Sequence, residues 1–386
     1  MKSSSFPFIR KALEERKQTN QFRRLVGSGP DGVYVNRNGR KLINFSSNDY
    51  LGLASNQEVQ QASISFTEEF GTGSTASRLI TGTHEHHLQL EKKLADAMGT
   101  EAALIFNSGY QANTTIIPAL ADRNTLILSD KLNHNSLLQG AYLSRGKLQR
   151  YRHNETGHLE GLLKKAVGKY DRVLIVTESV FSMDGDRADV GTLIGLANAY
   201  NAFLMIDEAH AIGVLGEQGM GLSAGKKGVD LVMGTFGKSF GSFGAFAACS
   251  NELRDYLINF CAGFIYTTAL PPGVIGAADK SLELICNMDD EREKLVRHSG
   301  YLRKSLHQMG FHTMASDTQI IPILIGNEDD TLSLSAHLEE QGIFAIAIRP
   351  PTVVKNSSRI RITISSKHTK NQIDQLLNAF KTWNDR

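Results

Sequence analysis

The sequence VDLVMGTFGKSFGSFGAFAA, residues 229–248, places a lysine just after an apolar strand. The apolar run at its start suits a buried strand, and the glycine-rich turn that follows carries Lys238. A second run, AFLMIDEAH at 202–210, has the same form and ends in Asp207. Ligands of open α/β sheets bind at the carboxyl ends of such strands. The two runs therefore predict one lysine and one aspartate at the same edge of a sheet.

Three motifs compete for this lysine. Residues 237–239 (GKS) resemble the end of a Walker A loop, but Val232 stands where that loop needs glycine. Residues 237–241 also fit the G-x-S-x-G nucleophile elbow, which needs a helix directly after the serine, whereas the small residues that follow suit a strand. The third interpretation is a lysine that forms a Schiff base with pyridoxal phosphate (PLP), with Asp207 on the pyridine nitrogen. It predicts a phosphate cradle and a ring-stacking group upstream.

Candidates for both groups lie upstream at strand-to-helix junctions. Residues 108–110 (SGY) follow an apolar strand and open a helix, where free N–H groups and the helix dipole favour a phosphate. An ordinary turn glycine is the alternative. His134 lies at the next such junction, and its flat imidazole could stack on a ring, although a lone histidine is more often structural.

Strands alternate with helices from about residue 101 to residue 248, which indicates a mostly parallel sheet covered on both faces. One of these strands, 172–178, leads into a polar turn that contains Ser182. Beyond residue 248 the pattern becomes that of a smaller α+β domain, and a long helical region is expected over 274–309. There Arg359 and Arg361 share one face of a strand by period two. They are either solvent-facing arginines of an edge strand or a fork for a carboxylate.

We expect three parts along the chain. Residues 1–50 form an N-terminal helix and hairpin segment, residues 51–280 a large PLP-binding α/β domain, and residues 281–386 a small C-terminal α+β domain. The first helix is expected over 6–25, and Asn-Gly at 38–39 between apolar residues predicts a hairpin turn.

Two further motifs are excluded by their context. Residues 71–76 (GTGSTA) match a dinucleotide fingerprint, which must follow a strand, but here they follow a helix expected over 56–70. A metal site is suggested by His84, His86 and His87. However, Leu88 occupies the position where the zinc motif H-E-x-x-H needs its second histidine. We therefore expect neither a dinucleotide nor a metal.

Composition narrows the class of protein. Lysine and arginine (42) nearly balance aspartate and glutamate (40), and no basic block of the nucleic-acid-binding type stands out. Apolar content of 41% with 21% charged residues is typical of a soluble globular protein. The three cysteines lack metal spacing, and neither a signal-type apolar region nor a run of membrane length is visible. We expect a cytoplasmic protein that binds neither nucleic acid nor membrane.

With the cradle, the ring stacker, Asp207 and Lys238 in order, the chain resembles the fold type I PLP-dependent transferases. Within them it is similar to the α-oxoamine synthases over almost its whole length, from Phe22 to about Ser365. The stretches that carry the resemblance are NFSSNDYLGL, HNSLL, TESVFSMDGD, DEAH, TFGKSFG and IYTTALPP. IRPPTV at 348–353, together with Arg23, favours a member of the biotin pathway, although composition alone makes Arg23 a solvated surface charge.

The resemblance implies a role for each matching residue. Lys238 would bind PLP as a Schiff base and move the α-proton of alanine, while Asp207 would keep the pyridine nitrogen protonated. His134 would stack on the ring. The other cofactor contacts implied are Gly109, Tyr110 and Thr235 at the phosphate, Ser182 and His210 at the ring oxygen, and Thr267 or Thr268 from a second subunit. The substrate contacts implied are Asn48, Arg361 for the amino-acid carboxylate, and Arg23 and Thr352 for the acyl group.

The resemblance also implies a reaction and a homodimer. The enzyme would condense L-alanine with a pimeloyl thioester of coenzyme A or acyl carrier protein, with loss of CO2, at an active site on the subunit interface. Relatives that use glycine, and serine palmitoyltransferase, share most of the motifs, so another α-oxoamine synthase stays open. A fold type I aminotransferase would use the same lysine and aspartate with an oxo acid, and a non-catalytic PLP-binding protein is a distant third alternative.

Overall fold

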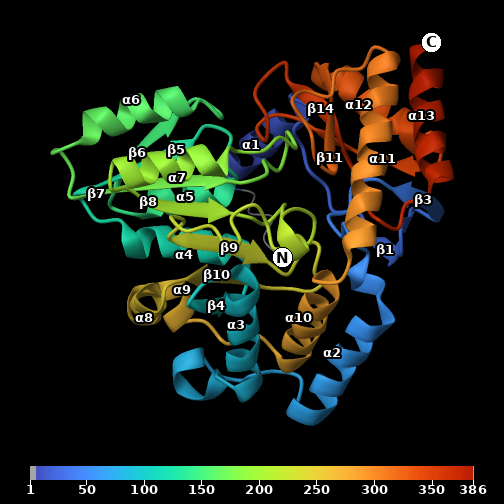
Figure 1. Ribbon diagram of the computed structural model, residues 1–386. Coiled ribbons are helices and arrows are strands. Elements are labelled where there is room, and N and C mark those ends of the chain that lie inside the picture. Colours follow the sequence, from blue (N-terminus) through green and yellow to red (C-terminus); the bar gives the residue numbers. More distant parts are fainter. Residues whose placement is uncertain (1–5, 386) are drawn as a thin grey trace. The chain divides into compact units, whose positions relative to one another are not determined.

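A computed structural model describes residues 6–385 of the chain, which divides into two compact units. Unit 1 contains the segment that ends at Ser47, the turn Met183–Gly185 and the segment that starts at Val296. Unit 2 contains Asn48–Ser182 and Asp186–Leu295. Figure 1 labels many of the elements of both units, numbered in chain order. Neither unit is a continuous piece of the chain.

A seven-stranded sheet forms the centre of unit 2, in the order β4-β10-β9-β8-β7-β5-β6. Its strands are β4 (Ala102–Phe106), β5 (Thr125–Asp130), β6 (Lys147–Tyr151), β7 (Arg172–Glu178), β8 (Phe203–Asp207), β9 (Leu231–Thr235) and β10 (Ala245–Cys249). The neighbours β9, β8, β7, β5 and β6 run parallel, and β10 is antiparallel to both β4 and β9. The predicted mostly parallel α/β sheet is confirmed.

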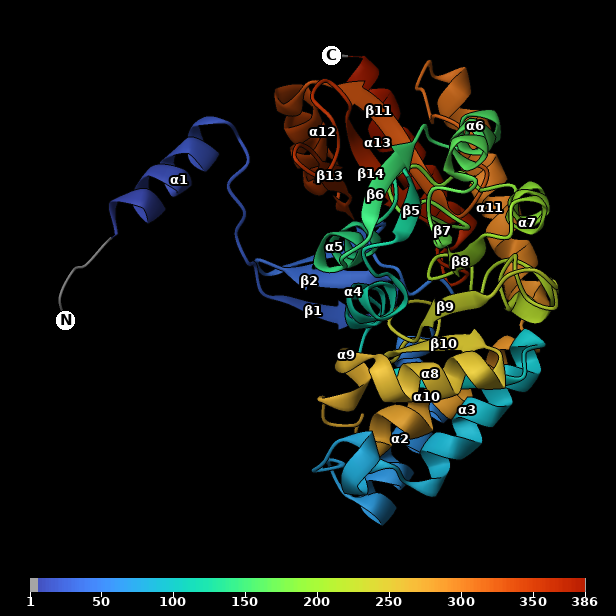
Figure 2. The same cartoon turned by 90° about the vertical axis from the view of Figure 1, so that its left-hand side faces the viewer.

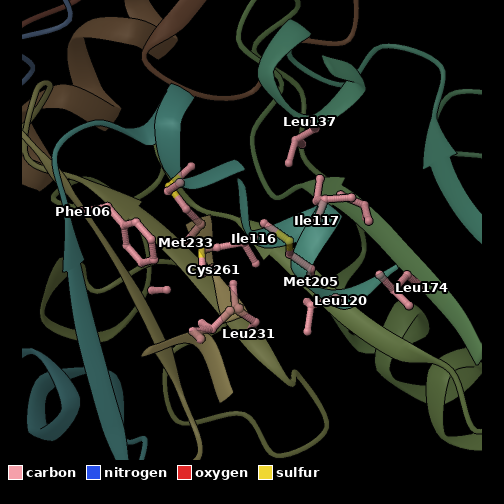
Figure 3. Packing of buried hydrophobic residues seen from close by; sticks show 14 of the residues in the cluster. Phe106, Ile116, Ile117, Leu120, Leu137, Leu174, Met205, Leu231, Met233 and Cys261 are labelled. Carbon is pink, nitrogen blue, oxygen red and sulfur yellow. The ribbon is translucent and has the colours of Figure 1, made fainter. Parts of the chain in front are cut away.

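Helices cover both faces of this sheet because its strands are apolar on both sides. Along β5, Ile127 faces one buried cluster while Leu126 and Leu128 face the other, as the period of two requires. The first cluster, shown in Figure 3, also contains residues of α4 (Gly109–Leu120), α5 (Asn135–Leu143), α8 (Asn251–Phe260) and α9 (Ala262–Ile265). The second contains residues of α6 (Thr156–Ala166) and α7 (Val190–Ala199). Figure 2 shows strands β5, β7 and β8 between these two sets of helices.

The remaining helices of unit 2 border the sheet. They are η1 (Leu53–Ser55), α2 (Gln57–Phe70), the π-helix η2 (Arg78–Gly82), α3 (Glu85–Met98), η3 (Glu217–Gly219) and α10 (Pro272–Ile285). The helix expected at 56–70 begins after Asn56, whose side chain accepts the backbone N–H groups of Glu58 and Val59.

One prediction about the helices is wrong. The single helical region expected over 274–309 is two helices, α10 and α11 (Asp289–Gln308), and α11 continues from unit 2 into unit 1. The new helix starts with Asp289, Asp290 and Glu291, whose negative charges stabilise a helix N-terminus.

Unit 1 contains two small sheets and three further helices. One sheet has the order β1 (Ser28–Asp31), β2 (Tyr34–Arg37), β3 (Arg40–Asn44), β12 (Ile343–Phe344), and the other the order β11 (Ile320–Gly326), β14 (Ser358–Thr363), β13 (Ile346–Ile348). The helices are α1 (Pro7–Gln18), α12 (Glu328–Glu340) and α13 (Lys370–Asn384). The predicted hairpin is present, and its turn residues Asn38 and Gly39 both have positive φ, 49° and 74°.

The helix α1 is shorter than predicted. It ends at Gln18 instead of near residue 25, because the hydroxyl of Thr19 bonds to the carbonyl of Glu15 and Asn20 adopts a left-handed φ of 53°. None of its residues is buried, and Figure 2 shows it apart from the other elements of unit 1. Arg23 therefore lies in an irregular segment after the helix.

None of the helices found within residues 6–385 has the length and the apolar character that crossing a membrane requires.

Candidate active site

Asp207 ends β8, and its carboxylate belongs to a buried hydrogen-bond network. One oxygen, Oδ2, accepts from Nδ2 of Asn113 at 2.8 Å, and Oδ1 accepts from the backbone N–H of Ala209 at 2.9 Å. The same nitrogen of Asn113 donates to Oγ of Ser136 at 2.9 Å, and Oγ lies 2.8 Å from Nδ1 of His134. A continuous run of hydrogen bonds therefore joins His134 to Asp207.

A second carboxyl group, that of Glu178, lies beside Asp207. The two residues are paired in the register of β7 and β8, and Glu178 is 2% exposed. It accepts hydrogen bonds from the backbone N–H groups of His134, at 2.5 Å, and Ser182. Burial raises the pKa of Glu178 well above its usual range, the charge of Asp207 adds to the rise, and the charge of Lys238 opposes it.

Lys238 is electrostatically coupled to the same residues. Burial lowers the pKa of His134, Asp207 opposes that decrease, and the positive charge of Lys238 adds to it. Lys238 thus lies close enough to His134 and Glu178 to change the pKa of each. The structure brings together the three residues predicted to be catalytic.

The turn that carries Lys238 is closely constrained between β9 and β10. Oγ1 of Thr235 donates to the carbonyl of Gly244 at 3.0 Å and accepts from the N–H of Gly237 at 3.2 Å. Gly241 has a φ of 60°, and a Cβ there would lie 2.1 Å from a neighbouring backbone nitrogen, so only glycine fits. The chain then enters β10 directly, without the helix that a nucleophile elbow requires.

The N-terminus of α4 has the geometry of an anion site. Ser108 caps the helix by accepting from the N–H of Gln111 at 3.1 Å, and residues 109–110 form the first turn. The first N–H groups of a helix have no partner within it and favour an anion. Nδ2 of Asn107, just before the helix, donates to Oγ1 of Thr267 at 3.3 Å and to the carbonyl of Thr268 at 2.8 Å. The part of these threonines in a partner's site stays a prediction.

His210 connects the acidic box to the segment that contains Asn48. Its Nδ1 lies 2.7 Å from the hydroxyl of Tyr50, which donates to Oδ1 of Asn48 at 3.1 Å. His210 and Tyr50 are both buried.

Unit 1 brings together the two residues predicted to meet the acyl group. Nη2 of Arg23 donates to Oγ1 of Thr352 at 3.3 Å, although the residues are 329 positions apart. Both side chains are exposed. Within residues 6–385 the guanidinium of Arg23 takes part in no ion pair, so its charge is available to an anionic ligand.

The two arginines of β14 are buried, at 4% exposure for Arg359 and 5% for Arg361. Their strand lies between β11 and β13, so the alternative of solvent-facing arginines on an edge strand is wrong. Nη1 of Arg359 pairs with Oδ1 of Asp184 at 2.6 Å. The expected binding of an amino-acid carboxylate by Arg361 stays a prediction.

The segment that carries Ser182 is held by His153. Nδ1 of this histidine lies 2.9 Å from Oδ1 of Asp130, and Nε2 lies 2.8 Å from Oδ2 of Asp186. The ring also packs edge-on against Phe181, with 4.4 Å between centroids. Burial would lower the pKa of His153, but the hydrogen bonds to the two carboxylates outweigh burial and raise the pKa to about 10. A protonated His153 therefore joins Asp130 to Asp186 at neutral pH.

This arrangement predicts a pH dependence of stability. Because the folded pKa of His153 exceeds the unfolded value, its contribution is complete below pH 6.5 and disappears as pH rises toward about 10. Urea unfolding at several pH values between 6 and 10 should show a decline in the free energy of unfolding that is smaller in the variant His153→Gln. Lysines and tyrosines titrate in both proteins, so the difference isolates His153. Equal declines would contradict the assignment.

Sequence reasoning missed four residues of the site: Asn113, Ser136, Glu178 and Tyr50. Glu178 had a usable signal, because it ends an apolar strand with an acid, as Asp207 does. Asn113 follows Gly109 by about one helical turn, but nothing in the sequence marks the direction of its amide.

Comparison with known proteins identifies the family of this chain. Residues 40–380 match the sequence profile of the family named aminotransferase class I and II. The chain belongs to this family. An 8-amino-7-oxononanoate synthase of Gluconacetobacter diazotrophicus is 47% identical to this chain over 383 residues. The match covers 97% of this chain and 96% of the relative.

Solved structures extend the comparison. A serine palmitoyltransferase from S. paucimobilis, with a bound PLP–myriocin aldimine, has a TM-score of 0.91 at 27% identity, covering 99% of this chain and 98% of that one. An 8-amino-7-oxononanoate synthase from Francisella tularensis has a TM-score of 0.78 at 28% identity, covering 89% and 98%. The predicted resemblance to the α-oxoamine synthases is confirmed, and this chain is a PLP-dependent enzyme of fold type I.

Proposed function

We propose that this enzyme condenses L-alanine with a pimeloyl thioester, releasing CO2 and the free thiol and giving 8-amino-7-oxononanoate for biotin synthesis. The observation that carries the proposal is the contact between Arg23 and Thr352, which presents an exposed cation beside a hydroxyl. A pimeloyl chain ends in a carboxylate, which such a pair suits. Relatives that carry the name of this activity add support.

The side chains of unit 2 fit PLP. The first turn of α4 supplies N–H groups for a phosphate, and the carboxylate of Asp207 accepts hydrogen bonds from Asn113 and Ala209. When bound, PLP acts as an electron sink for the α-carbon of an amino acid. Asp207 would hold the pyridine nitrogen, and His134 would lie against the ring.

The other cofactor contacts follow from the same arrangement. We assign Ser182 and His210 to the ring oxygen, and Gly109, Tyr110 and Thr235 to the phosphate. Lys238 would hold the cofactor covalently through Nζ and then move the α-proton of alanine. Its position beside His134 and Glu178, in a constrained turn, suits both tasks.

For the substrates we assign Arg361 to the carboxylate of alanine and Asn48 to the same substrate. A buried arginine suits a planar carboxylate, which it can bind with two parallel hydrogen bonds. Arg23 and Thr352 would meet the distal carboxylate of the pimeloyl group. Either coenzyme A or acyl carrier protein could present the thioester to these residues.

We also propose a homodimer whose partner covers the phosphate end of the site. Tyr266 is 83% exposed next to Thr267, and Tyr110 is 52% exposed in the first turn of α4. We assign these two exposed aromatic side chains to the surface that the partner covers. Thr267 or Thr268 of the partner would then reach the phosphate.

The variant Arg23→Ala tests the acyl assignment. A charge-assisted hydrogen bond is worth about 1.5–3 kcal/mol, so KM for the pimeloyl thioester should rise roughly 10- to 150-fold. The KM for the heptanoyl thioester, which has the same acyl length but no distal carboxylate, should change little. Steady-state kinetics with both thioesters at saturating alanine measure the difference.

Arg24→Ala is the matched control, because Arg24 is also exposed and directly follows Arg23. It should leave both KM values unchanged. If Arg23→Ala weakens the two thioesters equally, Arg23 does not bind the distal carboxylate, and the proposal reduces to an α-oxoamine synthase acting on another acyl group.

Transamination is the second candidate, since the matching family profile is that of aminotransferases. Alanine alone would then convert the bound cofactor to pyridoxamine phosphate and release pyruvate. A condensing enzyme consumes alanine only with a thioester, so a pyruvate assay without thioester separates the two.

A further inference from the structure

We infer that Glu178 is a positioning residue that holds His134 and Ser182, the proposed ring-stacking and ring-oxygen contacts, in their places around the cofactor. The inference rests on the proposed function only for the roles of those two residues. Glu178 would act through their backbones, without itself touching the cofactor.

The geometry places Glu178 between two separate segments. His134 precedes α5 and Ser182 follows β7, and neither segment belongs to a strand at that point. Each nevertheless donates a backbone N–H to the carboxyl group of Glu178. Glu178 itself ends β7 within the parallel sheet, where it pairs with Asp207. One rigid strand end thus sets the position of two loop residues.

A carboxyl group suits this position better than a neutral amide. Either oxygen of a carboxyl can accept a hydrogen bond, whereas an amide offers one acceptor oxygen and one NH2 donor. In Glu178→Gln one acceptor oxygen is therefore replaced by a donor, with almost no change in volume. The segment at His134 or at Ser182 must then shift, and displacements of about 1 Å at an active site cost about 10²-fold in rate.

The chain contains a matched control in Glu208. This residue follows Asp207, is 0% exposed, and accepts hydrogen bonds from the backbone N–H of Ser223 at 2.7 Å and from the hydroxyls of Ser179 and Ser223. Glu208→Gln makes the same chemical change at equal burial. One of these hydrogen bonds comes from Ser179, at the start of the segment that carries Ser182, but none of them comes from His134 or Ser182.

The test compares purified holoenzyme of the wild type, Glu178→Gln and Glu208→Gln. Both variants should lose thermal stability. Only Glu178→Gln should lower kcat/KM for alanine by about 10²-fold and change the visible circular-dichroism band of the bound cofactor, which depends on how its ring is held. If both variants lose stability and neither changes the band or kcat/KM, the role of Glu178 is only structural and the inference is overturned.

Borohydride reduction separates failure of this inference from failure of the proposed function. The wild type and both variants should carry the pyridoxyl group on Lys238 after reduction and peptide mapping. A wild type without that label overturns the proposed function. A labelled wild type in which the two variants behave alike overturns only the role of Glu178.

Hydrogen exchange of the wild-type holoenzyme keeps the inference testable if Glu178→Gln fails to fold. The backbone amides of His134 and Ser182 should exchange slowly for loop amides, because a buried carboxyl group accepts both. The amide of Lys131, which donates to the carbonyl of Tyr151, provides an internal reference for a hydrogen-bonded amide near a strand end. Unprotected exchange at His134 and Ser182 would contradict the inference.

Discussion

Replacing Lys238 with alanine is expected to lower kcat/KM for the condensation by about 10⁴-fold, the upper end of what a positioned acid or base contributes. The variant loses both the covalent attachment of PLP and the amine proposed to move the α-proton. Lys238 lies in a constrained turn between β9 and β10, which fixes where its side chain begins. Rates with alanine and pimeloyl thioester, measured with added PLP, give the change.

Borohydride labelling is the companion measurement. In the wild type the pyridoxyl group should map to the peptide that contains Lys238, and in Lys238→Ala it should be absent. The control is Lys226→Ala, an exposed lysine in the loop before β9, which should keep both label and rate. A label on any other lysine of the wild type would show that the site has been assigned wrongly.

Asp207→Asn is expected to lower kcat by about 10²–10³-fold, the usual effect of removing one preorganised electrostatic partner. The amide carries no charge to stabilise a protonated pyridine nitrogen. The NH2 group of the new side chain would also lie opposite a hydrogen-bond donor, because Asn113 and Ala209 both donate to the carboxylate of Asp207. Steady-state rates at saturating alanine and thioester measure the effect.

Asp230→Asn makes the same change at the opposite end of the sheet. Asp230 precedes β9 and accepts the backbone N–H of Leu204 at 2.7 Å, so this variant also weakens a hydrogen bond to a strand backbone. It should cost some stability and leave kcat unchanged. A near-normal kcat in Asp207→Asn would mean that another residue holds the pyridine nitrogen.

Apolar periodicity predicted the central sheet well where strands are buried. The sequences of β8 and β9 are apolar runs that are followed at once by polar or glycine-rich residues. Asp207 and Lys238 could therefore be placed at one sheet edge from sequence alone. By contrast, β6 was not predicted. It is an edge strand with mostly exposed side chains, KLQRY, held through backbone bonds to β5, and these leave no hydrophobic pattern.

The side chains of the candidate site could be predicted from the sequence, but the hydrogen bonds that connect them could not. His134 and Ser182 were identified as side chains, but their link to Glu178 runs through backbone N–H groups, which every residue except proline has. The identities of the side chains therefore do not indicate this link to Glu178. Likewise, the roles of Arg23 and Thr352 came from resemblance, while their contact depends on how distant segments of unit 1 meet.

The pairing of β3 with β12 has a consequence for synthesis of the chain on the ribosome. Ile43 pairs with Ile343, so about 300 residues must be added after β3 before its partner exists. At 5–20 residues per second this takes roughly 15–60 s. During that time β3 presents an open strand edge, which other nascent chains can pair with. A cell that makes this protein therefore has to keep its first fifty residues from aggregating until the last fifty have emerged.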